Sequence, residues 1–439
     1  MTARLRKLGS DMAETFWFVP ALIVTALIAL ASALVQLDRT DLVPRWLVEG
    51  AFIYNGGGTG ARTLLGAVAS STIGVAGTVF SITIAALSLA AGQMGPRLLR
   101  NFVRDRGNQV TLGLFLGTFS YALTVLRSVR TREEGEFIPH LSLSVGIALA
   151  FACVGMLVYF VGHTARRINV DTVIDLVSDE LTAAIRRLTC EEAPTPAEDA
   201  HAFDGVEIGD SRRGYLQHLN ADRLADWAAA EGVAIRLLVR PGDYVFPTAP
   251  IALVSPAHHG AAGAVRRATA LSMQRVSSED LEFAIRQLVE VAVRALSPGI
   301  NDPHTAISVL DRLGAALCDL APRHLPTGEW RRDGRVVLST PTVDYDGLTD
   351  AMCHLIRQNA AATPPVLLRL LEVLTAVAGR ERSPDRLTAL RRHAGLVRAD
   401  SERTVGNDAD KADIAARHAR FLNVADGGQL DAFPSDSHP

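Results

Sequence analysis

Four long stretches without Asp, Glu, Lys or Arg constrain this 439-residue chain more than any other feature of its sequence. They run from Phe16 to Leu37, Thr63 to Pro96, Gly107 to Leu126 and Phe137 to Gly162. A helix of about 20 apolar residues spans the hydrocarbon core of a bilayer, and lipid offers no partner to an unpaired backbone group. We therefore expect a four-helix transmembrane domain at residues 1–167, with spans at about 16–37, 64–94, 108–127 and 140–162.

Basic residues between these stretches predict their orientation. Nine cations lie on one side and six on the other, and the cytoplasmic side carries the excess of Lys and Arg. The larger set consists of Arg4, Arg6, Lys7, Arg97, Arg100, Arg104, Arg106, Arg166 and Arg167. We expect a multi-pass protein with both termini in the cytoplasm and a large cytoplasmic portion after the fourth span.

The second uncharged stretch has an unusual pattern of small residues. Steps of four and three place nine of them on one edge of a helix, which we call the small-residue seam: Ala67, Ser71, Gly74, Thr78, Ser81, Ala85, Ser88, Gly92 and Gly95. Small and hydroxyl-bearing residues let helices pack closely in membranes. The same residues also tolerate a water-filled pore. Both interpretations stay open, and the second makes Ser71, Gly74, Thr78, Ser81, Ala85 and Ser88 candidate pore-lining residues of a homo-oligomer.

A basic segment follows this stretch. Pro96 ends or kinks the helix, and Arg97, Arg100 and Arg104 would share one face of a helix after it. These arginines, with Gln93, are candidates for the cytoplasmic mouth of a pore. The alternative is that they only fix the orientation of the spans and meet lipid headgroups.

The fold expected overall is a membrane α-helical domain followed by a cytoplasmic α+β region with a small β module and a helical C-terminal part. Apolar residues at helical spacing predict an amphipathic juxtamembrane helix at 168–190. Short strands around an Ala-rich helix predict an α+β module at 203–256. Helical periodicity predicts a helical domain at 262–423, in which residues 335–345 read as one strand. Residues 424–439 are polar, broken by Gly and Pro, and expected to be disordered.

Composition excludes several functions. Only Lys7 and Lys411 are lysines, so neither a Gly-Lys-Ser/Thr phosphate loop nor a swinging-arm carrier can form. Four widely spaced cysteines and the lack of an HExxH motif predict no metal site, and His258-His259 is a poor metal pair because adjacent side chains diverge. The net charge of −3 argues against a nucleic-acid partner. We expect no cofactor and no enzyme activity.

One cytoplasmic motif stands out, at Leu296–Thr305. Pro298-Gly299 predicts a turn, Asn301 or Asp302 an N-cap, and Pro303 the first position of a helix. This structural interpretation explains the motif fully. The functional alternative is a small-ligand or cation site formed by Asn301, Asp302 and His304, with Arg275, Glu279 and Asp280 as partners if the chain folds back.

Several of these segments resemble one bacterial family of predicted membrane proteins, domain of unknown function 2254. The resemblance covers about residues 10–375 and rests on Ala61-Arg62, the Ser-rich second span, Gln93-x-Gly95-Pro96-Arg97, the third span and Leu296-Ser-Pro-Gly-Ile-Asn-Asp-Pro303. It implies four spans in the bacterial plasma (inner) membrane and a cytoplasmic region, and it carries no established activity. The function expected is an oligomeric, channel-like conduit regulated by the cytoplasmic region; the alternative is a membrane-anchored sensor or scaffold.

Overall fold

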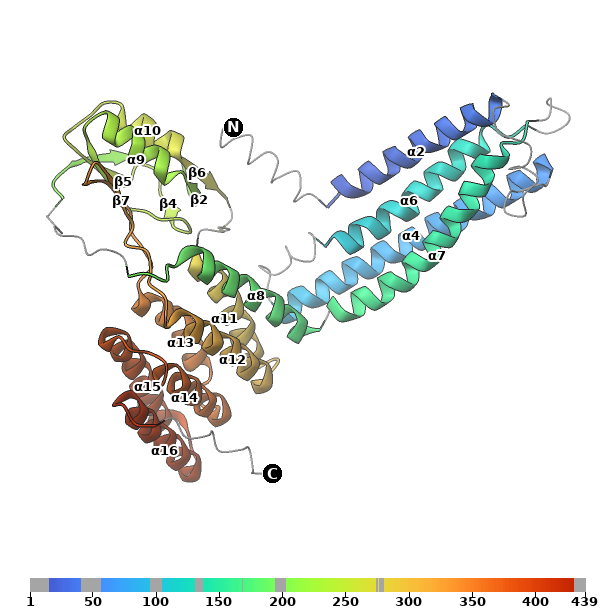
Figure 1. Ribbon diagram of the computed structural model, residues 1–439. Coiled ribbons are helices and arrows are strands. Elements are labelled where there is room, and N and C mark those ends of the chain that lie inside the picture. Colours follow the sequence, from blue (N-terminus) through green and yellow to red (C-terminus); the bar gives the residue numbers. More distant parts are fainter. Residues whose placement is uncertain are drawn as a thin grey trace. The chain divides into compact units, whose positions relative to one another are not determined.

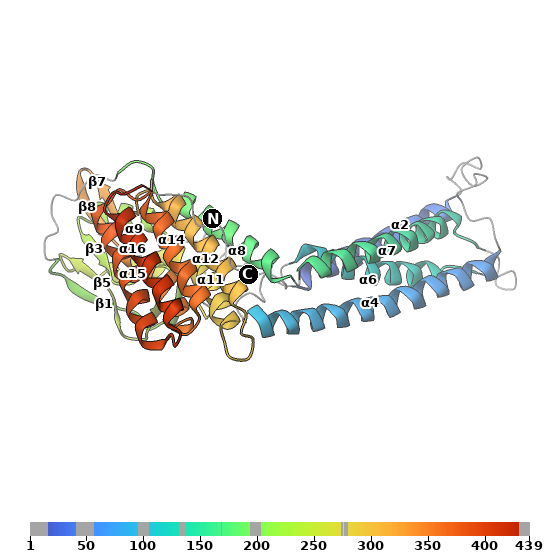
Figure 2. The same ribbon diagram turned by 90° about the horizontal axis from the view of Figure 1, so that it is seen from below.

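The computed structural model describes residues 16–40, 57–94, 105–130, 137–167, 169–193, 203–273, 275 and 280–429, with only the backbone described at 89–94 and 167. The chain forms two compact units, Met1–Asn169 and Val170–Pro439. Figures 1 and 2 show both units.

Four long helices make up the described part of the first unit: α2 (Phe18–Arg39), α4 (Gly58–Met94), α6 (Arg106–Leu126) and α7 (His140–Arg167). All four are long and apolar enough to cross a membrane. The prediction of four apolar helices is therefore confirmed. The helices differ from the predicted spans by a few residues at most ends, and α4 begins six residues before the predicted start of the second span.

Helix α6 is the centre of this unit, because it packs against α2, α4 and α7 and is the most buried of the four. Its contact with α2 is made by two glycines four residues apart. A Cβ at Gly113 would lie 3.0 Å from Cα of Pro20, and one at Gly117 would lie 2.6 Å from Cδ1 of Leu27. Small residues at this spacing allow the close approach of two membrane helices.

Polar contacts join the helices where α2 and α6 end and α7 begins. Asp38 accepts hydrogen bonds from the backbone N–H of Leu141 and Ser142 and from the Ser142 hydroxyl, the last at 2.6 Å. The first N–H groups of a helix have no hydrogen-bond partner within the helix. Asp38 therefore supplies acceptors for two of these groups at the start of α7. The hydroxyl of Tyr121 donates to the carbonyl of Ser142 at 2.8 Å.

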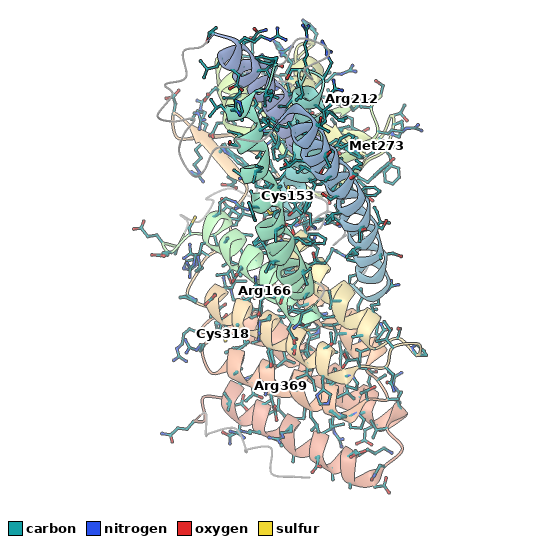
Figure 3. The ribbon with its side chains drawn as sticks, turned by 90° about the vertical axis from the view of Figure 1, so that its right-hand side faces the viewer. Cys153, Arg166, Arg212, Met273, Cys318 and Arg369 are labelled. Atoms are coloured by element: carbon teal, nitrogen blue, oxygen red, sulfur yellow. The ribbon has the colours of Figure 1, made fainter. Side chains whose placement is uncertain are left out.

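A sulfur contact lies in the interior of the same unit. The Cys153 thiol, labelled in Figure 3, is buried on α7 and donates to the Thr118 hydroxyl of α6 at 3.3 Å. The two side chains thereby satisfy each other away from water.

Two small sheets and two helices form the α/β part of the second unit. The strands are β1 (Val206–Gly209), β2 (Gly214–Leu219), β3 (Ala234–Leu237), β4 (Tyr244–Val245), β5 (Pro250–Ser255), β6 (Thr269–Ser272), β7 (Glu329–Arg332) and β8 (Arg335–Ser339). One sheet has the order β1-β5-β3-β8-β7 and is antiparallel except between β3 and β8; the other has the antiparallel order β4-β2-β6. Helices α9 (Ala221–Ala230) and α10 (Ala261–Ala268) bury their apolar faces in the same core.

Seven further helices form the helical part of this unit: α8 (Val170–Leu188), α11 (Leu281–Ala295), α12 (Pro303–Leu320), α13 (Tyr345–Asn359), α14 (Pro364–Ala378), α15 (Pro384–Thr404) and α16 (Asp408–Ala425). They stack in sequence, as Figure 1 shows: α8 packs on α11 and α12, α12 on α14, and α14 on α15 and α16. A mixed α/β region followed by a helical C-terminus is thus confirmed.

The strand assignments of this unit differ from the sequence-based expectation in two ways. Strands β6 and β7 come from ranges expected to be helical. Strand β8 lies within the strand predicted at 335–345, and it pairs with β3 of the α+β module. The sheet therefore uses residues beyond 203–256. Helix α16 extends to Ala425, into the segment expected to be disordered, and residues 430–439 lie outside the described part of the chain.

Candidate functional site

Helix α4 has three distinct faces. Buried side chains contact α6 and α7: they are Ala61, Leu65, Ala69, Thr72, Ala76, Val79 and Ala86. A second face exposes the bulky apolar side chains Ile73, Phe80 and Ile84, and Ile82 is exposed beyond the opposite edge of the small-residue seam. The small-residue seam forms the third face, on the side that points away from α6 and α7.

The described seam residues from Ala67 to Ser88 are exposed within their own unit. Ser71, Gly74, Thr78, Ser81, Ala85 and Ser88 are all exposed, and no atom lies within 4 Å of the place that a Cβ would take at Gly74. Packing against the chain's own described spans therefore does not explain the seam. Packing between copies and pore lining are the two interpretations that stay open.

The exposed face of α7 provides a comparison within the same unit. It carries large apolar side chains, with Phe151 73% and Val158 72% exposed. Such a surface suits contact with acyl chains, since lipid tails are as apolar as these side chains. The exposed seam of α4 is of a different kind, because it offers hydroxyls and backbone rather than bulky hydrocarbon.

The seam hydroxyls are held by their own helix. Ser71, Thr78 and Ser81 donate to backbone carbonyls three or four residues earlier, at 3.1, 3.2 and 2.9 Å. Each hydroxyl oxygen keeps its acceptor lone pairs. At these three positions the seam can therefore face an apolar neighbour without an unsatisfied donor, and it can still accept hydrogen bonds from water.

The predicted pore mouth lies largely outside the described residues. Arg97, Arg100 and Arg104 fall there, as does Gly95, and at Gln93 and Gly92 only the helical backbone is described. Their role stays a prediction.

A buried carboxylate and an imidazole meet at the other end of α6 from the Asp38 contacts. Asp105 Oδ2 lies 2.6 Å from His163 Nε2, and the other carboxylate oxygen accepts the backbone N–H of Gly107 at 2.9 Å. The side chain of Asp105 is 3% exposed. A mainly apolar hollow of about 410 Å³ opens beside this pair, lined by Arg106, Gly107, Val110, Gly155, Met156 and Tyr159.

The Leu296–Thr305 motif forms the predicted turn and cap. Asn301 has a left-handed backbone with φ of 50°, and Asp302 is the N-cap of α12. The Asp302 carboxylate accepts the backbone N–H of Thr305 at 3.2 Å and its hydroxyl at 2.6 Å. These bonds, the Thr305 hydroxyl first, lower the pKa of Asp302. His304 is exposed on the first turn.

The partners suggested for that motif are engaged elsewhere. Arg275 Nη2 lies 2.9 Å from Asp280 Oδ2, and Asp280 caps α11. Glu279 lies outside the described residues. Among the described residues Asp302 is thus used as a helix cap, and a ligand site at Asn301, Asp302 and His304 stays a prediction.

A cavity of about 320 Å³ lies between α12 and α14 in the second unit. Its lining is Asp311, Gly314, Ala315, Cys318, Arg369, Glu372, Val373 and Ala376; Cys318 and Arg369 are labelled in Figure 3. The Arg369 guanidinium already bonds Asp311 at 2.7 Å and Glu372 at 2.9 Å. The three charged side chains that line this cavity are therefore paired with one another.

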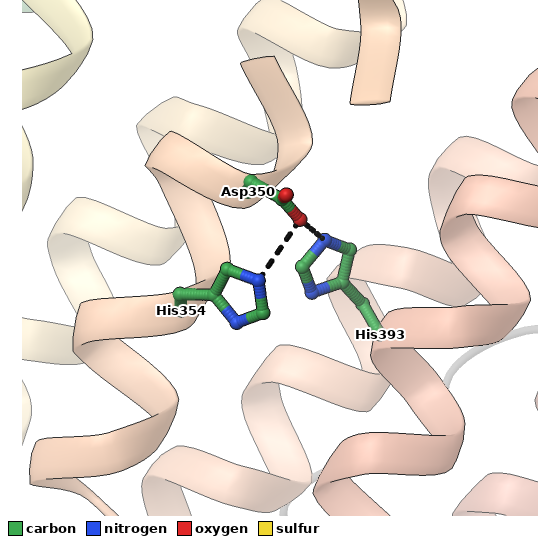
Figure 4. A group of neighbouring side chains, drawn as sticks. All are labelled: Asp350, His354 and His393. Atoms are coloured by element: carbon green, nitrogen blue, oxygen red, sulfur yellow. Dashed lines mark ion pairs between the residues drawn. The ribbon is translucent and has the colours of Figure 1, made fainter. Parts of the chain in front are cut away.

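A group that sequence reasoning did not find joins α13 to α15 (Figure 4). Asp350 and His354 are one turn apart on α13, and His393 faces them from α15; their ligand atoms all lie within 4.8 Å of one another. Asp350 Oδ1 is 3.0 Å from Nε2 of His354 and 3.0 Å from Nε2 of His393.

His393 is the unusual member of this group. Its side chain is 0% exposed, and neither ring nitrogen makes a hydrogen bond to a described residue. The contact of Nε2 with Asp350 is therefore short but not aligned as a hydrogen bond. Burial lowers the pKa of His393 to about 4, so the imidazole is neutral at pH 7.

Charged side chains surround this group. Burial acts to raise the pKa of Asp350, but the hydrogen bond from Arg392 and the charges of His354, Arg392 and His393 together outweigh it, so the pKa is lowered and the carboxylate is ionised at pH 7. Arg392 Nη2 lies 2.5 Å from Asp350 Oδ1 and 3.3 Å from Asp346 Oδ1. Two carboxylates thus share the Arg392 guanidinium. A second guanidinium, that of Arg357, has Nη2 3.4 Å from His354 Nδ1 and is itself paired with Asp400.

Two sequence signals could have found the features that were missed. The Asp350-x-x-x-His354 spacing puts both side chains on one helix face, although His393 enters only through the packing of α13 on α15. The Gly113-x-x-x-Gly117 spacing in an apolar helix is a known signal for close helix contact.

Taken together, the fold and these sites define an integral membrane protein: four apolar helices followed by a mixed α/β region and a helical C-terminal part. Residues 13–376 match the family described as predicted membrane protein (DUF2254), and the chain belongs to this family. The family resemblance expected from the sequence is therefore confirmed.

Curated relatives come from mycobacteria. The chain is 33% identical over 385 residues to uncharacterized protein MT1328 of Mycobacterium tuberculosis (strain CDC 1551 / Oshkosh), which covers 83% of this chain and 73% of that protein. The same values hold for uncharacterized protein Mb1321c of Mycobacterium bovis and uncharacterized protein Rv1290c of Mycobacterium tuberculosis (strain H37Rv). No solved structure was found to match the chain.

Proposed function

We propose that the chain assembles in the bacterial inner membrane into a homo-oligomeric conduit for ions or small solutes, lined by the small-residue seam of α4. The observation that carries this proposal is the exposure of the seam on a helix whose opposite side supplies the packing. From Ala67 to Ser88 the seam extends over about 32 Å at 1.5 Å per residue, which matches a hydrocarbon core of about 30 Å.

The spacing of the seam supports several copies around an axis. A crossing contact between two membrane helices typically uses a few small residues near the crossing point. Alternating steps of four and three give a period of 3.5 residues, which keeps one edge of a helix facing a common axis along its whole length. Hydroxyls on that edge with free lone pairs suit a hydrated lumen.

We further propose that the second unit lies in the cytoplasm and regulates the conduit. Helix α7 ends at Arg167 and α8 begins at Val170, so a movement of α8 would be passed to α7 through a very short connection. Helix α8 is in turn packed on α11 and α12. A small cytosolic ligand that shifts these helices, for instance in the cavity between α12 and α14, would change the position of α8.

Cysteine accessibility tests the lining directly. In a variant without the four natural cysteines, Thr78→Cys and Ser81→Cys are expected to react with a membrane-impermeant thiosulfonate reagent in reconstituted vesicles. Val158→Cys, on the bulky face of α7, serves as the matched control and is expected not to react. Equal protection of all three positions would overturn the proposal.

Flux provides the second measurement. Ser81→Leu is expected to abolish the uptake of a permeant ion or small solute into proteoliposomes, because the added side chain fills the lumen, whereas Val158→Leu leaves it unchanged. Assembly is checked by size and cross-linking in both variants. The alternative function, a membrane-anchored sensor or scaffold, is favoured if the seam cross-links copies of the chain but stays closed to water.

A further inference from the structure

Asp350, His354 and His393 have the composition of a metal site. Two imidazoles and one carboxylate are ligands that zinc commonly uses, at about 2.0–2.2 Å. Ligand atoms around a tetrahedral zinc at that distance are about 3.3 Å apart, and the two N···O separations here are 3.0 Å each. The side chains are therefore close to the separations that a shared ion requires.

The burial of His393 is a second, independent indication of a bound metal ion. A fully buried imidazole with neither nitrogen in a hydrogen bond is costly, because each buried polar group needs a partner. The Nε2 atom of His393 lies close to the Asp350 Oδ1 atom, but the angle between them does not allow a hydrogen bond. A cation beside the carboxylate, on the Nε2 lone-pair axis, would satisfy this nitrogen.

The ion pair with Arg392 does not block the site permanently. Arg392 also lies 3.3 Å from Asp346 Oδ1, so Asp346 can retain the guanidinium when the Asp350 carboxylate turns to a metal. The Arg357 guanidinium, which contacts His354, is paired with Asp400, so the Asp350 carboxylate can serve the bound cation. Asp350 and His354 are 37% and 32% exposed, which leaves room for water to complete the coordination.

We propose that Asp350, His354 and His393 bind one Zn²⁺ per chain, with water in the fourth position, and that the ion links α13 to α15. His393 lies after residue 376, where the match to the family ends. The site lies wholly in the second unit and stands independently of any conduit formed by α4.

Zinc titration of the full-length, chelator-stripped protein tests this site. In detergent and without an affinity tag, isothermal titration and elemental analysis are expected to give one Zn²⁺ per chain. His354→Gln is expected to weaken binding at least about ten-fold, since even outer-shell changes often cost that much. His259→Gln, an exposed histidine elsewhere in the same unit, is the control and leaves affinity unchanged.

Folding and binding can be told apart. His393→Gln is expected to abolish zinc binding, and if this buried replacement unfolds the unit, the half-exposed His354 decides the question. Co²⁺ offers a spectroscopic check, because the visible bands of His and carboxylate coordination vanish in His354→Gln. A wild-type protein that binds no Zn²⁺, or a His354→Gln protein that binds it as tightly as wild type, would overturn the proposal.

Discussion

Asp105 Oδ2 and His163 Nε2 lie 2.6 Å apart, and they connect the first turn of α6 to the last turns of α7. The same carboxylate also caps α6 through the N–H of Gly107. The Asp105 side chain thus both caps the N-terminus of α6 and connects α6 to α7. A Cβ at Gly107 would lie 2.7 Å from His163 Nε2, so the close approach depends on the glycine as well.

Asp105→Ala is expected to lower the thermal stability of the first unit more than Asp105→Asn. Alanine loses both the cap, worth about 1 kcal/mol, and the partner of a half-buried histidine, whereas asparagine keeps the cap. The buried Cys153 thiol provides the readout, in a variant lacking the other three cysteines: a thiol-reactive dye labels it only when this unit opens. Equal melting temperatures for both variants would show that the cap is not used.

The glycines of α6 predict a second difference. Gly113→Ala is expected to lower the melting temperature of the first unit, because the new Cβ would meet Cδ1 of Ile23 at 2.8 Å and the Pro20 backbone at 3.0 Å. Overpacking of this kind costs about 1–3 kcal/mol. Gly155→Ala is the matched control, since nothing lies within 4 Å of a Cβ there. The same Cys153 labelling measures the melting temperatures. Equal melting temperatures for the two variants would contradict a tight contact between α6 and α2 at Gly113.

The spans could be predicted from the sequence because lipid leaves few choices. An uncharged stretch of the length of Phe16 to Leu37 has hardly any stable form but a helix, and composition alone identifies it. Helix packing is harder to predict from the sequence than the spans are. The spacing of its residues identified the small-residue seam. Its position on α4 relative to α6, however, depends on contacts with segments distant in the sequence. Only the structure places it on the exposed side.

Strand pairing in the second unit was the hardest to foresee. The five residues of β8, Arg335–Ser339, read as a short strand, but nothing local shows that they pair with β3 about a hundred residues earlier. The contact between His393 and Asp350 could not be predicted either, because it joins two helices through tertiary packing. The Asp302 cap, by contrast, is entirely local, and its residues predicted it.

Replacement of Asp302 distinguishes a helix cap from a ligand-binding group. Asp302→Asn is expected to change stability by less than about 1 kcal/mol, because asparagine is an equally good N-cap, whereas Asp302→Ala is expected to cost about 1 kcal/mol. Dye labelling of the buried Cys353 thiol, with the other cysteines removed, reports on the second unit. A large loss in Asp302→Asn would show that the carboxylate does more than cap α12.

Glu282 joins the α/β part of the second unit to its helical part, and its ionisation predicts a pH dependence. Oε1 bonds Arg240, from the loop after β3, at 2.6 Å, and Oε2 bonds Arg286 at 2.8 Å. Burial acts to raise the pKa of Glu282, but the hydrogen bonds from Arg286 and Arg240 outweigh it, so the pKa is held below its usual value. A carboxylate with a lowered pKa stabilises the fold above its unfolded pKa of about 4.3, and this contribution is lost as the pH falls through the folded value.

Glu282→Gln is therefore expected to destabilise the second unit by about 2–3 kcal/mol at pH 7, because two guanidinium groups lose an anionic partner. The difference from wild type is expected to narrow below about pH 4, where the wild-type side chain becomes protonated as well. Glu207→Gln, on the exposed strand β1, controls for a simple loss of charge. Melting curves followed by circular dichroism, from neutral pH down to about one unit below the unfolded pKa of about 4.3, measure the effect. A pH-independent difference between Glu282→Gln and wild type would mean that packing, rather than the ionised carboxylate, holds the two parts together.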